Sequence, residues 1–146
     1  MNQRDKLLAI VANDLEQDCD DYLALRDLMQ ALYAFLLERD SPEIDRLNLQ
    51  ITTRVETLAL RAQRRAKVLG AFRLPQDADG MQRLLAGYPE EQAARVRQLW
   101  QQLGALATQC QQINERNGKL LAMHHEILEQ LLAGSHDARL YQPQGY

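Results

Sequence analysis

Residues 89–132, PEEQAARVRQLWQQLGALATQCQQINERNGKLLAMHHEILEQLL, decide the fold of this chain. Their apolar residues recur in alternating steps of three and four, which keeps one stripe of a long α-helix facing a partner helix. Pro89 and the two glutamates after it suit the first turn of a helix, and Gly134 suits its end. The stripe consists of Val96, Leu99, Leu103, Leu106, Cys110, Ile113, Asn117, Leu120, His124, Ile127 and Leu131.

A flanking line widens this stripe, so that the helix over 89–132 is expected to touch two neighbours at once. At 1.5 Å per residue the helix would span about 65 Å. The flanking line consists of Trp100, Ala107, Asn114, Leu121 and Leu128.

Upstream of this segment, a stripe with the same spacing predicts a helix over residues 4–39. Asp18 is the one charged residue in the stripe. We expect it either at a solvated boundary between helices or paired with an arginine. The stripe consists of Leu8, Val11, Leu15, Asp18, Tyr22, Leu25, Met29, Leu32 and Leu36.

A very short turn follows, because Ser41 suits an N-cap and Pro42 suits the first helical position. A second helix is therefore expected over 42–73, antiparallel to the first. Two consecutive steps of four around Ile51 and Val55 shift its heptad pattern. The stripe of this second helix consists of Ile44, Leu47, Ile51, Val55, Leu58, Ala62, Leu69 and Phe72.

The remaining segments are a connector and a tail. In the connector, 75–88, Met81, Leu84 and Leu85 fit one or two helical turns that cap the bundle. Residues 134–146 have no helical period and are expected to form a flexible, irregular C-terminal tail. The sequence thus predicts an all-α protein: an elongated, antiparallel three-helix coiled-coil bundle with a short connector helix, forming one helical domain over 1–133.

The charges are unevenly distributed. Residues 1–40 contain nine acidic and four basic residues, whereas residues 41–75 contain three acidic and seven basic ones. This difference favours pairing of the first two helices, although each exposed ion pair contributes only about 0–1 kcal/mol. The basic cluster Arg61, Arg64, Arg65 and Lys67 is interpreted as a solvated face near the acidic helix. With a net charge of −3 and few aromatics, nucleic-acid binding is not expected.

Features that would indicate an enzyme or a membrane protein are missing from the sequence. There is no apolar run of about 20 residues, no signal peptide, no phosphate-binding loop and no nucleophile elbow. Cys19 and Cys110 are interpreted as reduced core thiols of a cytosolic protein. His124, His125, Glu129 and Cys110 do not have the spacing of metal ligands, and the apolar stripes contain no arginine or lysine for a small anion. We expect no cofactor, no metal and no catalysis.

Asn117 stands inside the apolar stripe, where a polar side chain fixes helix register at some cost in stability. It is interpreted either as a register-setting residue of the bundle or as a contact for a bound helix, and both roles remain open. Gly118, next to it, costs about 1 kcal/mol relative to alanine in a helix. Close approach of another backbone at this position would explain why a glycine is present despite that cost.

Two short motifs resemble the FlgN family of flagellar export chaperones. The first is N-x-x-N-G-x-L-L, matched by Asn114, Asn117, Gly118, Leu120 and Leu121. The second, L-Y-x-x-x-G, is matched by Leu140, Tyr141 and Gly145. The chain departs from the family pattern at Pro143, and it has no polar extension after Tyr146.

The resemblance implies a cytoplasmic chaperone that binds the hook–filament junction proteins, of the FlgK and FlgL type. Such a chaperone keeps them from assembling and delivers them to an export-gate protein of the FlhA type. An amphipathic helix of the cargo would enter an apolar groove. We expect Leu140 and Tyr141 to contact the gate. The expected cargo-binding residues are Ile113, Asn114, Asn117, Gly118, Leu120, Leu121, His124, Ile127, Leu128 and Leu131.

Two other classes fit the heptad pattern. A structural coiled-coil adaptor or a self-assembling helical protein would use the same stripes, and a homodimer is left open. A small-molecule enzyme or sensor built in a helical bundle fits the sequence less well, because no convergent polar residues mark a ligand site.

Overall fold

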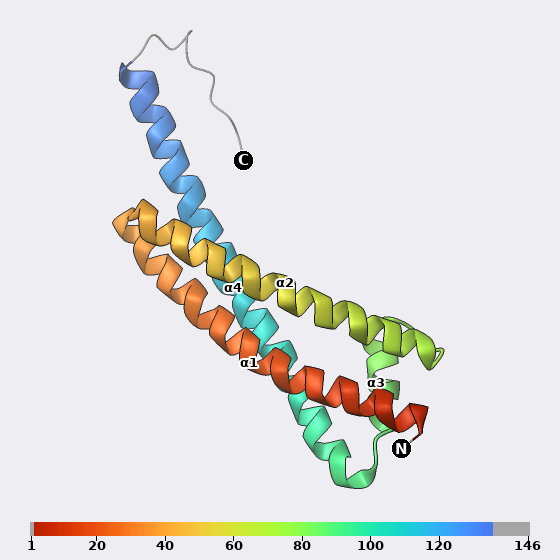
Figure 1. The fold of residues 1–146 in the computed structure, drawn as a ribbon. Coiled ribbons are helices and arrows are strands. Elements are labelled where there is room, and N and C mark those ends of the chain that lie inside the picture. Colours follow the sequence, from red (N-terminus) through yellow and green to blue (C-terminus); the bar gives the residue numbers. More distant parts are fainter. Residues whose placement is uncertain (1, 136–146) are drawn as a thin grey trace.

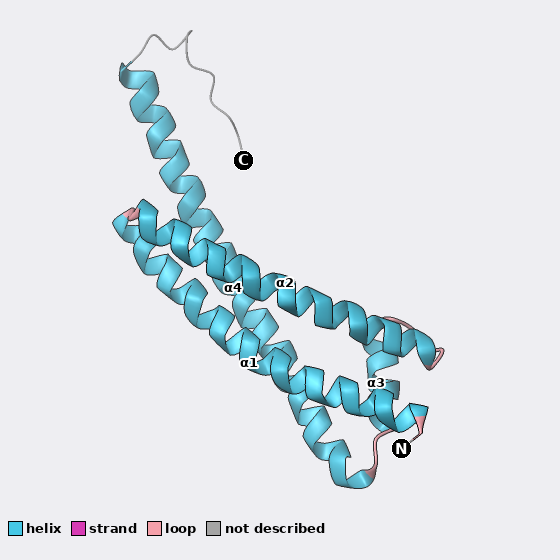
Figure 2. Cartoon of the chain, in the orientation of Figure 1, coloured by secondary structure: helices cyan, strands magenta, loops and turns pink. Residues whose placement is uncertain are grey.

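The computed structural model describes residues 2–135, apart from the side chains of Leu128 and of residues 133–135. Within this range the chain forms four α-helices and no strand (Figure 2), so the all-α prediction is confirmed. The elements are α1 (Gln3–Glu38), α2 (Ser41–Ala71), α3 (Ala78–Ala86) and α4 (Glu90–Ser135).

The long helix α1 packs against both α2 and α4, and in Figure 1 α4 crosses behind the pair that α1 and α2 form. α2 runs antiparallel to α1, and α4 then runs parallel to α1. Across the described residues, no Cα atom of α2 comes within 8 Å of a Cα atom of α4. The bundle is therefore held together through α1, with the short helix α3 closing the end that contains the N-terminus.

The stripe of α1 is buried along nearly its whole length, as its spacing predicts. Its exception is Tyr22, which is half-buried. The stripe of α2 behaves differently: Val55 and Ala62 are exposed, whereas Leu58 between them is buried. This break follows the shift of the heptad at Ile51 and Val55, because two steps of four rotate the stripe away from α1.

The turn between α1 and α2 is built by two residues. Arg39 takes the left-handed conformation, φ 57° and ψ 38°, where glycine is usually found. Its N–H donates to Leu36 O at 3.2 Å, and the N–H of Asp40 donates to Phe35 O at 3.0 Å, which together form a Schellman motif. Asp40, not Ser41, caps α2, because its carboxylate accepts from the N–H of Glu43 at 3.3 Å.

The connector contains α3, which caps the bundle as expected. Its apolar residues Met81, Leu84 and Leu85 are buried against α1, α2 and α4. A Cβ atom at Gly80 would overlap the carbonyl of Pro75, so only glycine fits there. Tyr88 links the loop between α3 and α4 to α1, since its buried hydroxyl donates to Leu8 O at 2.6 Å. Burial raises the pKa of Tyr88 far above its ordinary value, so the phenol keeps its proton.

Candidate functional site

The contacts between α1 and α4 set the position of the C-terminal half of α4. Cys19 Sγ lies 3.4 Å from Leu99 O near the start of the interface, and Arg26 donates to Gln109 Oε1 at 3.3 Å in its middle. Further along, the guanidinium of Arg116 stacks 3.6 Å from the ring centroid of Tyr33. Cation–π contacts of this kind contribute about 0.5–2 kcal/mol.

Asn117 occupies the buried end of this interface, and its side chain is only 4% exposed. Its Nδ2 donates to the main-chain oxygen of Met29 at 2.9 Å, whereas its Oδ1 is buried without a hydrogen-bond partner in residues 2–135. A slip of α4 along α1 would leave the whole amide unpaired, at a cost of about 1–3 kcal/mol. This geometry agrees with the interpretation of Asn117 as a residue that sets the register of α4 against α1.

Beyond Asn117, the face of α4 that packs on α1 runs past the end of α1. The α1–α2 turn is level with His124, because His124 and Leu121 line a depression together with Leu36 and Ile44. From His124 to Ser135 the helix extends by about 16 Å at 1.5 Å per residue. In Figure 1 these last turns of α4 lie beyond the turn and away from the other helices.

Apolar side chains of the extended part are open to solvent. Leu121 is 52% exposed and Leu132 41% exposed, and Met123 and Leu131 are exposed as well. Leu121, Leu131 and Leu132 continue the helical face that Asn117 occupies, because positions 4, 14 and 15 residues after Asn117 lie within about 60° of it around an α-helix. The extended end of α4 thus displays apolar surface that none of the four described helices covers.

The depression at the α1–α2 turn is a mostly apolar hollow. It has a volume of about 180 Å³, enough for one large apolar side chain. Leu36 forms its buried floor. Its lining consists of Leu36, Arg39, Ser41, Ile44, Leu121 and His124.

The residues expected to bind cargo fall into three groups. Ile113, Asn117 and Leu120 pack against α1, and Ile113 and Leu120 remain partly accessible. Asn114, Gly118, Leu121 and Leu131 are exposed, and His124 and Ile127 are half-buried. The side chain of Leu128 lies outside the described residues, as do Leu140 and Tyr141 and the rest of the expected tail over 136–146. Of these exposed and half-buried residues, Leu121 and His124 line the depression at the α1–α2 turn and Ile127 and Leu131 lie beyond it on α4, whereas Asn114 and Gly118 lie on the part of α4 that packs on α1.

The close backbone approach expected at Gly118 is wrong. A Cβ atom placed on Gly118 would have no neighbour within 4 Å, and Gly104 on the same helix is equally open. Contacts among the described residues therefore do not explain this glycine.

The expected solvated basic face of α2 is partly wrong. Arg61 and Arg65 point inward and pair with Asp18, which is 1% exposed, so the predicted arginine partner of Asp18 is confirmed. Arg65 also lies 5.5 Å from the ring centroid of Trp100 on α4. The apolar stripes contain no arginine, yet Arg61 and Arg65 point inward, because long side chains beside a stripe can reach buried carboxylates.

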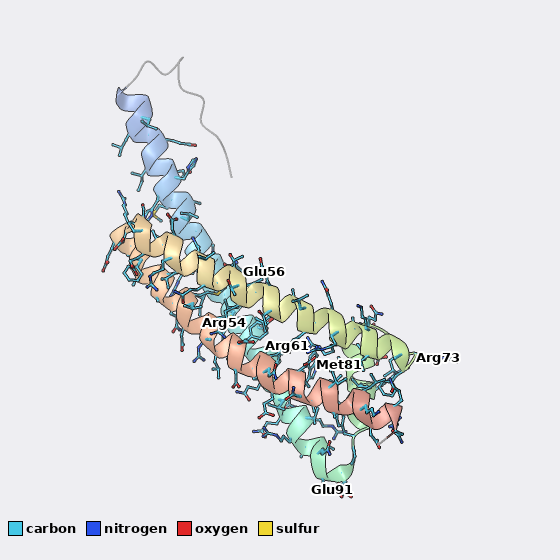
Figure 3. The ribbon with its side chains drawn as sticks, in the orientation of Figure 1. Arg54, Glu56, Arg61, Arg73, Met81 and Glu91 are labelled. Carbon is cyan, nitrogen blue, oxygen red and sulfur yellow. The ribbon has the colours of Figure 1, made fainter. Side chains whose placement is uncertain are left out.

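Further ion pairs link the same two helices. Asp14 pairs with Arg64, and Asp21 pairs with Arg54 and Arg61, all across the α1–α2 interface. Figure 3 shows Arg54 and Arg61 between α1 and α2. The predicted attraction between the acidic first segment and the basic second segment is confirmed. These carboxylates engage the arginines of the cluster, so the inward cations are neutralised by partners within the chain.

Neither cysteine has the surroundings of a reactive thiol. Both are buried and free, and burial raises the pKa of Cys19 and of Cys110. A raised pKa keeps a thiol protonated and a poor nucleophile. Within residues 2–135, no three potential ligand side chains gather where they could hold a metal ion. No helix of that range is long and apolar enough to cross a bilayer.

Sequence reasoning missed two residues of this region. No sequence pattern marks Arg116, because its stacking on Tyr33 depends on the stagger between α4 and α1, which are far apart in sequence. The sequence pattern marks Arg39 only as the end of a helix. The signal for its left-handed conformation was the Asp-Ser-Pro run directly after it, which ends one helix and begins another without a glycine.

The fold and the open end of α4 define the class of this protein as an extended α-helical bundle with an apolar surface at one end. The FlgN protein family matches residues 2–146, nearly the whole chain. The chain belongs to the FlgN family, a family of flagellar export chaperones. No curated protein and no solved structure matches it.

Proposed function

We propose that this protein is a cytoplasmic chaperone for hook-associated flagellar subunits of the FlgK and FlgL type. It binds a terminal helix of the subunit, prevents premature assembly and delivers the subunit to the export gate. It acts by binding alone, without catalysis and without a cofactor. The observation that carries the proposal is the apolar surface on the part of α4 that extends past the α1–α2 turn.

The shape of this surface supports a helical cargo. Amphipathic helices dock through apolar residues spaced by three, four and seven positions, and such residues fit a groove beside another helix. The extended part of α4 offers Leu121 and Leu132 in line, with the depression between α4 and the α1–α2 turn beside Leu121. Subunits of a filament expose terminal helices before they assemble, so covering such a helix prevents self-assembly.

Substitutions of exposed leucines test the cargo surface. Leu121→Asp and Leu132→Asp each place a charge where cargo would bury an apolar side chain, and each should weaken binding of a hook-associated subunit at least tenfold by calorimetry. Leu60→Asp is the matched control, since Leu60 is 66% exposed on α2, outside the surface. If both α4 variants bind as tightly as the control while circular dichroism shows an intact fold, the proposal is wrong.

The proposed gate contact rests on Leu140 and Tyr141. These residues form a short apolar pair in a polar segment, a composition suited to reversible docking into a groove. Tyr141→Ala is expected to weaken binding of an FlhA-type gate protein while the affinity for cargo stays unchanged. Equal loss of both affinities, or no change in either, would contradict a separate gate contact.

Light scattering separates the chaperone from the alternative of a self-assembling helical protein. The chaperone reading predicts a one-to-one complex with a hook-associated subunit. A chain that associates only with itself, and elutes unchanged when the subunit is added, would favour the alternative.

A further inference from the structure

Arg39 is the one charged group that lines the apolar depression at the α1–α2 turn, apart from the titratable imidazole of His124. The Arg39 side chain is exposed and forms no ion pair or hydrogen bond with any residue of the range 2–135. By contrast, two nearby carboxylates have partners of their own: Asp40 caps α2, and Glu43 pairs with Arg46 at 2.6 Å. A cation without a partner therefore stands beside an apolar hollow.

Ser41 adds a hydrogen-bond donor at the same place. It is the first residue of α2 and lines the depression, while the carboxylate of Asp40 caps the N-terminus of that helix. The hydroxyl of Ser41 makes no hydrogen bond to another residue of the described chain and can donate to an acceptor. An arginine and a hydroxyl beside one hollow form surroundings that favour a carboxylate.

We propose that the depression binds an apolar anchor of the cargo helix and that Arg39 pairs with a carboxylate of the same helix, one turn from the anchor. The depression thus selects amphipathic helices that carry an aspartate or glutamate three or four residues from a large apolar side chain. This inference rests on the proposed function, because it assigns the charge pattern of the cargo.

The left-handed backbone of Arg39 permits a substitution that removes the cation without harming the fold. Glycine is favoured at this position of a Schellman motif, so Arg39→Gly should fold at least as stably as the natural chain. Arg73 offers a matched control: it has φ 58°, its N–H donates to Gly70 O at 3.0 Å, and the N–H of Leu74 donates to Leu69 O at 2.9 Å. Figure 3 shows Arg73 at the end of α2 that is farthest from the α1–α2 turn.

The experiment measures binding of a hook-associated subunit by calorimetry at low and high salt. Arg39→Gly is expected to weaken binding about three- to fivefold at low salt and less at high salt, as for one ion pair at the rim of an interface. Arg73→Gly should leave the affinity unchanged. Equal affinities of Arg39→Gly and Arg73→Gly would overturn the inference, while failure of every subunit to bind the natural chain would overturn the proposed function with it.

A charge exchange identifies the partner group. In a peptide of the subunit's terminal helix, each acidic residue is replaced by lysine in turn, and every peptide is tested against the natural chain and against Arg39→Glu. One lysine peptide should lose affinity for the natural chain and regain it with Arg39→Glu. No such recovery at any position would contradict the pairing. If Arg39→Gly instead abolished a self-associated dimer, the occupant would be a second copy of this chain and the inference would be wrong.

Discussion

Asn117 and Met29 join α4 to α1 by a hydrogen bond of 2.9 Å from the amide nitrogen to a main-chain oxygen. The bond lies just before the point where α4 leaves the rest of the bundle. It therefore fixes how far α4 extends past the α1–α2 turn, and with it the length of apolar surface on display.

The first prediction concerns Asn117. Asn117→Leu removes the buried Oδ1 that has no partner in the described chain and adds apolar burial, so the free energy of unfolding should rise by about 1 kcal/mol. Asn117→Asp should lower it by about 3 kcal/mol, because it buries a charge without a cation beside it. Urea denaturation measures both. A stability loss in Asn117→Leu would show that the amide contributes more than register.

The second prediction concerns Asp18, which lies between Arg61 and Arg65. Asp18→Asn leaves two inward guanidinium groups without their shared carboxylate and should reduce the free energy of unfolding by about 3 kcal/mol. Glu43→Gln, which breaks the exposed pair with Arg46, serves as the control and should leave it unchanged within error. Equal effects of the two substitutions would contradict a structural role for the buried network.

The third prediction concerns acid sensitivity. Burial acts to raise the pKa of Asp21, but hydrogen bonds from Arg61 and Arg54 outweigh it and hold the pKa below the ordinary value of 3.8. A lowered pKa in the folded state means that Asp21 stabilises the fold above pH 3.8 and that this stabilisation is lost as pH falls below it. Asp21→Asn should therefore flatten the fall of stability with pH in this range, measured by thermal unfolding. An unaltered slope would refute the assignment.

The fourth prediction compares two glycines. Gly80→Ala forces a Cβ atom into the carbonyl of Pro75 and should cost about 2–3 kcal/mol. Gly118→Ala meets open space inside a helix and should increase the free energy of unfolding by about 1 kcal/mol. Thermal unfolding of the two variants would show shifts of opposite sign. If cargo binding weakens in Gly118→Ala while the fold is stabilised, the glycine serves close approach of the cargo.

Much of the fold could be predicted because the buried face of a long helix appears in the sequence as apolar residues at a regular spacing. Apart from the half-buried Tyr22 and Ile113, the stripe of α1 and the first two thirds of the α4 stripe are buried as their spacing requires. The pairing of acidic α1 with basic α2 also follows from composition, since opposite charges on adjacent helices attract over several ångströms.

Other features depend on how the helices are placed relative to one another, which the spacing of apolar residues along a single helix does not determine. The inward direction of Arg61 and Arg65 follows from the distance between two helix axes, because a long side chain beside the stripe can reach a buried carboxylate. The end of the burial near His124 follows from the stagger of α4 against α1, not from any change in the sequence pattern. For the same reason the depression beside Arg39 could not be foreseen, since three helices contribute to it.

The parallel arrangement of α1 and α4 has a consequence for synthesis on the ribosome. Cys19 and Leu99, which touch across this interface, are 80 positions apart, whereas α1 and α2 meet through a two-residue turn. The α1–α2 hairpin can therefore form while translation continues. At that stage the face of α1 that later packs against α4 is still exposed to solvent. Completion of the core then waits for the last third of the chain, so the nascent hairpin is the stage at which this protein is most open to aggregation.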